Sequence, residues 1–525
     1  MTAAAAPTRT SDLLHRRVRT PDWMLLVLAT AVALAVRLPP ILASGFPTGD
    51  GGLFLQMLED LRHSFPALPA TMSYNGAGIP FVYPPLAFYI AAAIGNAFGI
   101  SSTDLLRFLP LAFSVLGVAA FYVLARMVLG SSAHAFVAGM AFAVLPRSYD
   151  WLVGGGGLTR APGLLLAFLT LIAALRAFDN GRQRNWAIVG IGLGATALAH
   201  PQAAIFAAVG LVALLLFNRP ASFLPGMATA IVCAIAVVTP WLIGLVVIHG
   251  PSGVSALASA GQRWDPWLGL AALADFGLAG GPLYAGPVML GFAGLIACLI
   301  LGRYLLPVWT ALVFLAGAGG ASFLAMPLVA MLIATFVLDV VLRIDSTPVS
   351  RPTRLRTSLV LAAVLAIALA SGVSPSYSEA FRLRGLSTDQ RNAMAWVSTN
   401  TPTKARFIVV EPAVWGIAGE WFPAIAHRIS LNTLQGSEWE GRDAFERRGE
   451  ISSAVAGCAA VGGDCLAQLA EDTGLTDALV FIPKATLDSG GDCCLALRLS
   501  LTDSPAYRLI YDDEGATIFE PREPN

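Results

Sequence analysis

Charged residues are scarce in this chain. Asp, Glu, Lys and Arg make up 13% of its 525 residues and hydrophobic residues make up 56%, whereas a soluble domain carries roughly 25% charged residues. Lysine occurs only at Lys404 and Lys484, and basic and acidic residues balance at 33 each. The chain therefore has no net positive charge that would favour binding to nucleic acid. The composition excludes an ordinary soluble domain and predicts that most of the chain faces lipid or other apolar helices.

The N-terminus raises the alternative of a signal peptide, because four arginines between Arg9 and Arg19 precede an apolar run from Trp23 to Leu42. The run is about twenty residues long, which is enough to cross a hydrocarbon core of roughly 30 Å. No clear small-residue cleavage site follows it. We therefore interpret the run as a first membrane span, with residues 1–22 in the cytoplasm by the positive-inside rule.

Further apolar stretches recur along the next 330 residues or so, and about eleven crossings are expected in all. They lie at about 105–125, 133–147, 160–178, 186–200, 202–217, 223–248, 285–302, 304–319, 322–342 and 357–373. The segment Tyr83–Phe98 is shorter, at about sixteen residues, and begins with Tyr-Pro-Pro, which favours a re-entrant or interfacial helix over a span. Without this crossing, the arginines of the loops fall on the cytoplasmic side, as expected. These are Arg126, Arg182, Arg184, Arg219, Arg303 and the run 343–356.

This count of spans sets the domain organisation. Residues 23–373 form a transmembrane unit, with a large external loop at 43–104 that contains interfacial helices and further external loops at 147–160 and 249–284. Residues 374–525 form an external tail whose strand-like runs at 406–410, 478–482 and 507–511 predict a small α/β domain. The turn Asp-Asp-Glu-Gly before Ala516–Phe519 predicts a hairpin. The expected fold class is a mainly α polytopic membrane protein with a C-terminal extracytoplasmic α/β domain.

Cysteine is rare, and most of it lies in the tail. Disulfides are expected among these tail cysteines because an external compartment is oxidising. A metal site is the alternative, but there is no C-x-x-C pattern and no histidine after His427. The pairing stays open at this point. The tail cysteines are Cys458, Cys465, Cys493 and Cys494, while Cys233 and Cys298 fall in predicted spans as packing residues.

Carboxylates are the scarcest groups in the membrane unit, where no glutamate occurs between Asp60 and Glu379. Asp50 stands just past the first span in Pro-Thr-Gly-Asp-Gly-Gly, and its glycine neighbours allow close approach of a ligand. A carboxylate there is placed to act as general base on an acceptor hydroxyl. The alternative is that Asp50 caps the helix expected at 53–63, along which Glu59 and Asp60 form a solvated face.

The second external loop combines charge with a glycine run. It contains Arg147, Asp150, four glycines at 154–157 and Arg160. Arginine makes bidentate contacts to phosphate, and glycine amides can cradle its oxygens. The loop therefore suits a lipid-phosphate group. An interfacial loop in which Arg147 pairs with Asp150 is the alternative.

Other candidates are weaker. His200 interrupts an apolar run near the external surface. Because ionisable residues at membrane depth are usually functional, it is a candidate contact to the phosphate. A polar break between two helices explains this histidine equally well. In the tail, Glu420-Trp421 and Glu438-Trp439 suit contacts to an acceptor or sugar ring, and packing is their alternative. Three residues on external loops, His63, Arg263 and Asp265, are the least supported.

The order of these features resembles the GT-C superfamily of membrane glycosyltransferases. The resemblance is carried by the first span, the external loop that opens with Asp50, an amphipathic helix, Tyr-Pro-Pro-Leu-Ala-Phe-Tyr at 83–89 and Leu-Arg-Phe-Leu-Pro at 106–110. It covers roughly residues 20–220. Members include protein O-mannosyltransferases, aminoarabinose transferases of lipid A, arabinofuranosyltransferases and oligosaccharyltransferases. The tail lacks the Trp-Trp-Asp-Tyr-Gly motif of the last group.

The resemblance implies a catalytic role for Asp50, as base or as ligand of acceptor and metal, and makes Asp150 the second acidic position. It allows a divalent metal, Mg or Mn, held by Asp50 and Asp150. Against such a metal, Asp50 is followed by glycines and Asp150 has no acidic neighbour, whereas a divalent cation wants more oxygen ligands. No cofactor is required by the sequence itself.

The sequence thus predicts a glycosyltransferase in the inner or cytoplasmic membrane. It would transfer a sugar from a polyprenyl-phosphate-linked donor to an acceptor hydroxyl on a glycan, lipid or protein at the external face. The partners are the donor, the acceptor and membrane lipids. The alternative is a transporter or lipid-handling protein with an external ligand-binding domain, although matched inverted repeats typical of transporters are not seen.

Overall fold

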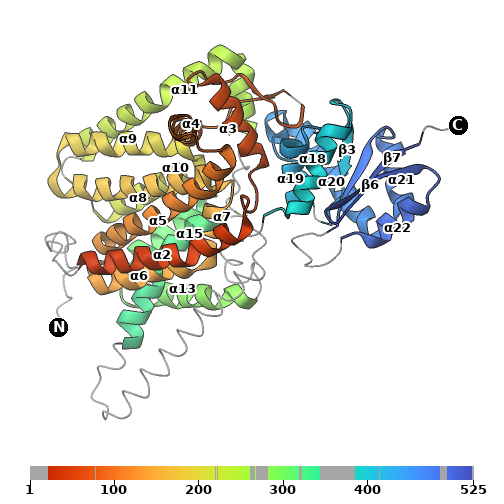
Figure 1. The fold of residues 1–525 in the computed structure, drawn as a ribbon. Coiled ribbons are helices and arrows are strands. Elements are labelled where there is room, and N and C mark those ends of the chain that lie inside the picture. The colour runs from red at the N-terminus through yellow and green to blue at the C-terminus, as the bar shows by residue number, and fades with distance from the viewer. Residues whose placement is uncertain are drawn as a thin grey trace, which may run out of the picture.

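The computed structural model describes residues 22–259, 267, 282–342 and 385–522, apart from residues 77, 219, 221, 222, 318–321, 413, 415 and 485–492. Within these ranges the chain forms a helical region at residues 22–342 and a C-terminal unit at residues 385–522 (Figure 1). The predicted span at 357–373, the cytoplasmic N-terminus up to residue 21, Arg263 and Asp265 lie outside the described residues.

Every predicted apolar stretch within the described residues coincides with a helix. Five helices, α2, α5, α8, α11 and α15 with its π-helical extension, are long and apolar enough to cross a membrane, and several apolar helices are shorter. The number that cross stays a prediction. The helices are α2 (Asp22–Ser44), α5 (Ser102–Leu129), α6 (Ser132–Val144), α8 (Gly157–Asn180), α9 (Gln183–Ala199), α10 (Pro201–Phe217), α11 (Phe223–Ser259), α13 (Pro282–Ile300), α14 (Leu305–Leu315), α15 (Ser322–Thr335) and the π-helix η4 (Phe336–Val341).

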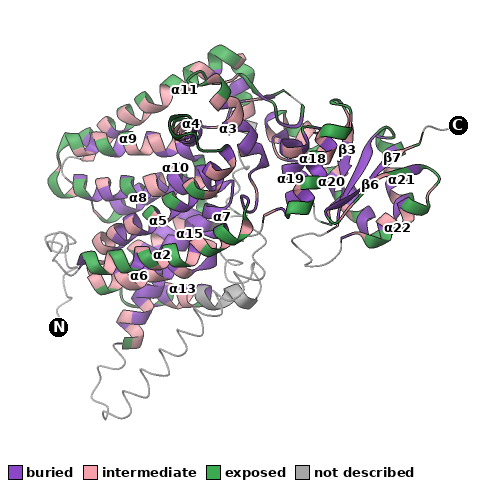
Figure 2. Cartoon of the chain, in the orientation of Figure 1, coloured by how far each residue is buried: buried purple, intermediate pink, exposed green. Residues whose placement is uncertain are grey.

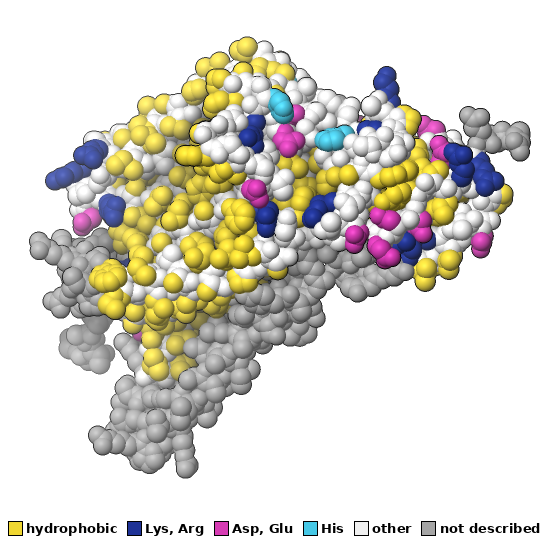
Figure 3. All heavy atoms as spheres, in the orientation of Figure 1, with side chains coloured by type: hydrophobic (Ala, Val, Ile, Leu, Met, Phe, Trp, Pro, Cys, Tyr) yellow, Lys and Arg dark blue, Asp and Glu magenta, His cyan; other side chains and the backbone are white. Residues whose placement is uncertain are grey.

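The outer surface of the helical region is apolar. Helix α11 leaves Leu224, Val232 and Val247 exposed, and exposed residues run along α2, α9 and α11 in Figure 2. In Figure 3, hydrophobic side chains cover most of the visible helical face, while charged side chains gather over the C-terminal unit, at its junction with the helices and at the opposite end. A wide apolar surface of this kind is stable in lipid rather than in water.

The loop between α2 and α5 carries short elements instead of spans. They are α3 (Gly52–Ser64), β1 (Thr71–Met72), the 3-10 helix η1 (Tyr74–Gly76), β2 (Ile79–Pro80) and α4 (Leu86–Phe98). Helix α4 has 13 residues and, at 1.5 Å per residue, is about 20 Å long, which is too short to span. It is seen end-on in Figure 1 while α2, α5 and α8 lie lengthwise. Its geometry agrees with an interfacial helix.

A buried arginine of α2 ties this helix to α5 and α6. The Arg37 guanidinium is fully buried and donates to the carbonyl oxygens of Ser114 and Phe142, at 2.8 and 2.9 Å. It also lies 5.2 Å from the ring of Tyr149 and within 3.5 Å of Ser148 Oγ. An ionisable group at membrane depth needs polar partners, and the contacts of the two Nη atoms tie α2 to α5, to α6 and to Ser148 in the loop after α6. That loop leads into η2 (Pro146–Ser148) and α7 (Asp150–Val153).

The C-terminal unit contains a five-stranded sheet in the order β4-β3-β5-β7-β6. Strands β4, β3 and β5 are parallel, and β7 pairs antiparallel with both β5 and β6. The three predicted strands and the predicted hairpin are present. The two-residue β4 was missed. The elements are α18 (Thr388–Asn400), β3 (Arg406–Val409), α19 (Ile417–Ala426), β4 (Ile429–Ser430), η6 (Ser437–Trp439), α20 (Arg442–Val461), α21 (Gly463–Thr473), β5 (Leu479–Pro483), α22 (Leu495–Asp503), β6 (Tyr507–Asp512) and β7 (Ala516–Pro521).

Alternation along the central strands divides this unit between two cores. One set of side chains, with Ile408 and Val480 among them, packs against α20, α21 and α22. The other set, with Phe407 and Phe481, packs against α18 and α19 in a cluster that continues into α3 and α4 of the helical region. One face of the sheet therefore joins the C-terminal unit to the loop that carries Asp50.

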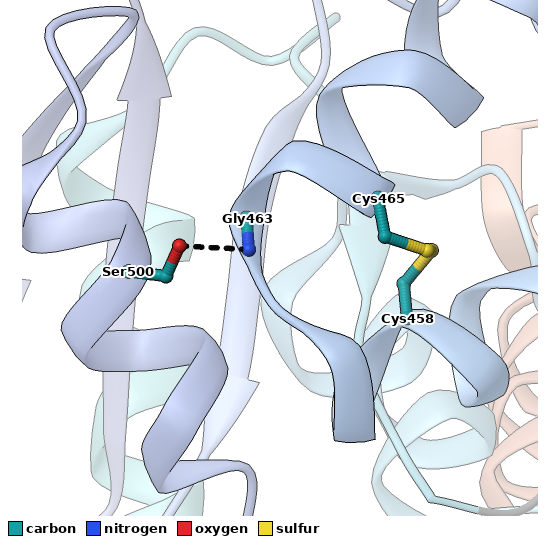
Figure 4. Close-up of a disulfide and its surroundings, with 4 residues drawn as sticks. All are labelled: Cys458, Gly463, Cys465 and Ser500. Atoms are coloured by element: carbon teal, nitrogen blue, oxygen red, sulfur yellow. Dashed lines mark hydrogen bonds between the residues drawn. A yellow bond between two sulfur atoms is a disulfide. The ribbon is translucent and has the colours of Figure 1, made fainter.

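The tail cysteines form two disulfides, as predicted. Cys458 of α20 is bonded to Cys465 of α21, and Cys493 to its neighbour Cys494. Figure 4 shows the first bond at the turn between α20 and α21, where the N–H of Gly463 donates to Ser500 Oγ of α22 at 3.0 Å. Cys233 and Cys298 are free. The first disulfide and the hydrogen bond hold three helices together on one face of the sheet.

Replacing Cys458 and Cys465 together by serine is expected to lower the thermal unfolding midpoint of the C-terminal unit. The bond closes a loop with a sequence separation of 7, and a crosslink over a loop of that size stabilises by about 2 kcal/mol. Thermal unfolding of the full chain in detergent measures the change, with Cys233→Ser as the control. An unchanged midpoint in the double variant would show that the bond contributes nothing to stability.

Candidate functional site

Asp50 lies on a short loop, residues 45–51, that is bound by hydrogen bonds on two sides; we call it the Asp50 loop. The N–H groups of Gly155 and Gly156 donate to the carbonyl oxygens of Thr48 and Asp50, both at 2.9 Å. A Cβ on Gly155 would lie 2.4 Å from the Asp50 carbonyl oxygen. The glycine run is therefore needed because two backbones touch here.

Two sequence interpretations, one of the glycine run and one of Asp50, were wrong. The amides of residues 155–157 donate to backbone oxygens of the protein, so they are not free to cradle a phosphate. Helix α3 has Gly51 at its N-cap position, with no side-chain capping bond. Asp50 is therefore not the cap of that helix.

The carboxylate of Asp50 pairs with the guanidinium of Arg160, which lies in the first turn of α8. The two distances are 2.7 Å from Nη2 to Oδ2 and 3.3 Å from Nη1 to Oδ1. Arg160 also stacks on Trp151, with 4.5 Å between its Cζ atom and the ring centroid. The side chains of Asp50 and Arg160 are 32% and 17% exposed. The pair is therefore oriented by two contacts but still reachable by a ligand.

The C-terminal unit supplies two further carboxyl groups. Glu420 of α19 is 5% exposed, and its Oε1 accepts from the N–H of Gly51 at 2.8 Å. Glu438 of η6 is half-buried, beside Trp439. Burial raises the pKa of Glu420 to about 8, assisted by the nearby charge of Asp50, and raises the pKa of Glu438 to about 7. Glu420 is thus mostly protonated at neutral pH.

These groups line one cavity of about 570 Å³ between the helical region and the C-terminal unit; we call it the site cavity. Its volume is in the range of small-molecule sites. Apolar and aromatic side chains share the wall with the charged groups. The lining residues are Asp50, Gly51, Leu53, Phe54, Tyr83, Trp151, Gly156, Arg160, His200, Gln202, Gly416, Ile417, Glu420, Gln435, Glu438 and Trp439.

His200 reaches the cavity from the junction of α9 and α10. It is buried, and its Nδ1 accepts from the N–H of Ala203 at 3.3 Å, which caps α10. His200 therefore both marks the break between α9 and α10 and lies at the site, as the two interpretations of the sequence proposed. His200 also lines the cavity, where its imidazole ring can supply a polar contact.

Some predicted residues are not on the cavity wall. Arg147 lies in η2 and Asp150 begins α7, where its Oδ1 accepts from the N–H of Trp151 at 2.7 Å. Trp421 is fully buried behind the wall, with its Nε1 donating to Gly49 O at 2.9 Å. His63 lines a separate open groove near β1. Packing thus accounts for Trp421 better than sugar stacking does.

Several lining residues were not candidates from the sequence. Tyr83 belongs to the Tyr-Pro-Pro motif, and its hydroxyl lies 3.2 Å from Thr159 Oγ1. Trp151 follows Asp150 directly. Both Tyr83 and Trp151 could have been named as site candidates, because each lies in or next to a motif that the sequence analysis singled out. Gln202 and Gln435 have no such marker, because neutral amides are not scarce enough to stand out.

The donor set does not fit a divalent metal. Asp50 already pairs with an arginine, and Asp150 bonds to its own helix. Within the described ranges no group of three or more His, Cys, Asp or Glu side chains converges as a metal site would require. We therefore derive no catalytic step through a metal.

The comparisons with known proteins agree on a fold. Residues 82–243 match the family model of dolichyl-phosphate-mannose-protein mannosyltransferases, while no curated protein sequence matches the chain. Among solved structures, ArnT from Cupriavidus metallidurans bound to undecaprenyl phosphate is 13% identical, with a TM-score of 0.55, covering 95% of this chain and 98% of that one.

Two other structures have the same architecture. Archaeal oligosaccharyltransferase AglB from Archaeoglobus fulgidus, in complex with an inhibitory peptide and a dolichol-phosphate, is 16% identical with a TM-score of 0.54, covering 88% of this chain and 69% of that one. Arabinofuranosyltransferase AftD from Mycobacteria is 16% identical with a TM-score of 0.52, covering 96% and 40%. The chain has the fold of the GT-C superfamily of membrane glycosyltransferases, and the predicted resemblance to that superfamily is confirmed.

Proposed function

We propose that the chain transfers a sugar from a polyprenyl-phosphate-linked donor to an acceptor hydroxyl at the external face of the membrane. The observation that supports this most is the Asp50–Arg160 pair on the wall of the site cavity. It places a base for the acceptor beside a guanidinium suited to a phosphate. The GT-C fold adds support, because similar structures hold undecaprenyl phosphate and dolichol-phosphate.

The reaction is a single displacement. The acceptor hydroxyl gives its proton to the Asp50 carboxylate as its oxygen bonds to the anomeric carbon of the donor. The bond from that carbon to the phosphate oxygen breaks, and the electron pair leaves with the phosphate. Arg160 stabilises the charge that develops there. Since a bound phosphate competes with Asp50 for the guanidinium, donor binding loosens the ion pair and makes Asp50 a stronger base.

The remaining wall suits the sugar. Trp439 packs edge-on against Tyr83, with ring centroids 5.9 Å apart, and aromatic faces bind the apolar faces of sugar rings. Glu438 and Gln435 offer hydrogen bonds to hydroxyl groups. We assign His200 to the phosphate end of the cavity. Arg147 and Asp150 stay candidates for roles outside the cavity wall.

The proposed topology places the N-terminus in the cytoplasm and the C-terminal unit outside. The loop after α2, the start of α8 and the start of α10 all meet at the site cavity, as they must if the site lies on one face. The two disulfides suit an oxidising compartment.

The test is sugar transfer by purified protein in lipid nanodiscs from a panel of polyprenyl-phosphate sugars. We expect turnover with at least one donor. We also expect a chelator to leave the rate unchanged, because the donor set does not fit a divalent ion. Saturable binding of lipid or solute without turnover would favour the transporter alternative, and loss of activity with EDTA that added Mg²⁺ restores would overturn the metal-free site.

A further inference from the structure

Helix α19 of the C-terminal unit holds the Asp50 loop as well as the glycine run does. The side-chain carboxyl of Glu420 accepts from the N–H of Gly51 at 2.8 Å. The backbone carbonyl oxygen of Glu420 accepts from the Tyr74 hydroxyl at 2.6 Å. Trp421 donates to Gly49 O at 2.9 Å. The residues before and after Asp50 are thus both bonded to α19.

The fit between this helix and the loop is close. A Cβ on Gly52 would lie 2.4 Å from the carbonyl oxygen of Glu420, and one on Gly51 would lie 3.1 Å from the Trp421 ring. The Trp421 ring also packs on Phe46, with 4.7 Å between centroids. A shift of α19 therefore moves the loop, and the carboxylate of Asp50 with it.

We propose that Glu420 is a positioning residue for the transfer reaction, which holds the Gly51 backbone so that the Asp50 carboxylate stays aimed beside Arg160. This rests on the proposed function, since it concerns the geometry of the same site. Glu420 lines the cavity, but it acts on the reaction through the backbone beside Asp50. Its carboxyl group is bonded to the N–H of Gly51. The C-terminal unit is then part of the catalytic site rather than an appended domain.

The neutral form of Glu420 suits this role. The titratable groups that face it are Asp50 on the loop, Arg160 on α8, Glu438 on η6 and Tyr74 on η1. Its pKa is raised to about 8 by burial and by Asp50. Above that pH an ionised Glu420 places a second negative charge beside Asp50 and against the anionic donor, so donor binding weakens.

Protein stability follows the same titration. The folded chain keeps a proton on Glu420 that the unfolded chain, with a carboxyl pKa near 4.5, releases. The contribution of Glu420 to stability therefore declines as pH rises between the two pKa values, from about 4.5 to about 8. Replacement by glutamine removes this decline, because an amide does not titrate.

The experiment compares Glu420→Gln, Glu420→Ala and the control Glu446→Gln, a glutamate on the exposed surface of α20 whose side chain is 61% exposed. Transfer is measured from pH 6 to pH 10 with the donor that supports turnover. Glu420→Ala is expected to lower kcat roughly 10²-fold, as small misplacements at a reacting centre do. Glu420→Gln accepts the same N–H, so it should recover at pH 7 most of the activity that the alanine variant loses, without the wild-type decline above pH 8.

Three outcomes contradict the proposal. They are wild-type kcat in Glu420→Ala, an equal loss in the glutamine and alanine variants, and an alkaline decline that persists in Glu420→Gln. If the alanine variant does not fold, the pH profile of the glutamine variant decides alone. A wild-type protein that turns over no donor would instead reject the proposed function, and the positioning role with it.

Discussion

Replacing Asp50 by asparagine is expected to lower the rate of sugar transfer about 10³-fold at saturating donor and acceptor, within the usual range for loss of a general base. Asparagine has the same shape and still accepts a hydrogen bond from Arg160, but it cannot take a proton. The loop keeps its backbone bonds to Gly155, Gly156 and Glu420, so the fold and donor affinity should change little. The readout is kcat, with donor Kd measured separately.

The matched control for this variant is Asp104→Asn. Asp104 is about half exposed, lies near the same face at the start of α5, and also pairs with an arginine. Exposed ion pairs contribute little, so this variant should transfer sugar at the wild-type rate. A wild-type rate in Asp50→Asn would remove Asp50 from the reaction and leave its pair with Arg160 as a structural contact.

Replacing Arg160 by lysine is expected to raise the donor KM and lower kcat by roughly 10–100-fold each. Lysine keeps the positive charge but loses the planar fork that matches a carboxylate or a phosphate at two points. It also loses the stacking of the guanidinium on Trp151. Because phosphate charge grows as the donor bond breaks, part of the loss appears in kcat and part in KM.

Arg182→Lys is the control for this variant, because Arg182 is exposed in the loop between α8 and α9, at the opposite end of α8 from Arg160. Steady-state kinetics with varied donor concentration separate the two constants. Unchanged donor KM and kcat in Arg160→Lys would mean that the phosphate binds elsewhere, and Arg147 would then be the next arginine to replace.

The sequence predicted much of the helical region, because apolar stretches about twenty residues long report membrane burial directly. It also named Asp50, Arg160 and His200, since charged residues in apolar surroundings stand out against a plain background. Arg147 and Asp150 were named by the same criterion and occupy the same loop as Arg160, but they do not line the cavity, and their roles stay predictions. Sequence proximity alone does not show which way a side chain points.

The sequence named Glu420 as a candidate for acceptor or sugar contacts, but its hydrogen bond to Gly51 was not visible there. Glu420 is 369 residues from Gly51, and the contact depends on how α19 docks against the Asp50 loop. No local pattern encodes such a long-range contact, whereas strands β3, β5, β6 and β7 could be predicted from their own runs of β-branched and aromatic residues. The close approaches at Gly51, Gly52 and Gly155 likewise follow from packing between distant segments.

The most direct test of the central claim measures two products at once, the sugar transferred and the polyprenyl phosphate released, for the wild type and for Asp50→Asn in lipid nanodiscs. We predict one polyprenyl phosphate per sugar transferred by the wild type, and a parallel fall of both products in the variant. Saturable donor binding with release of neither product, in the wild type as in the variant, would contradict the assignment as a glycosyltransferase.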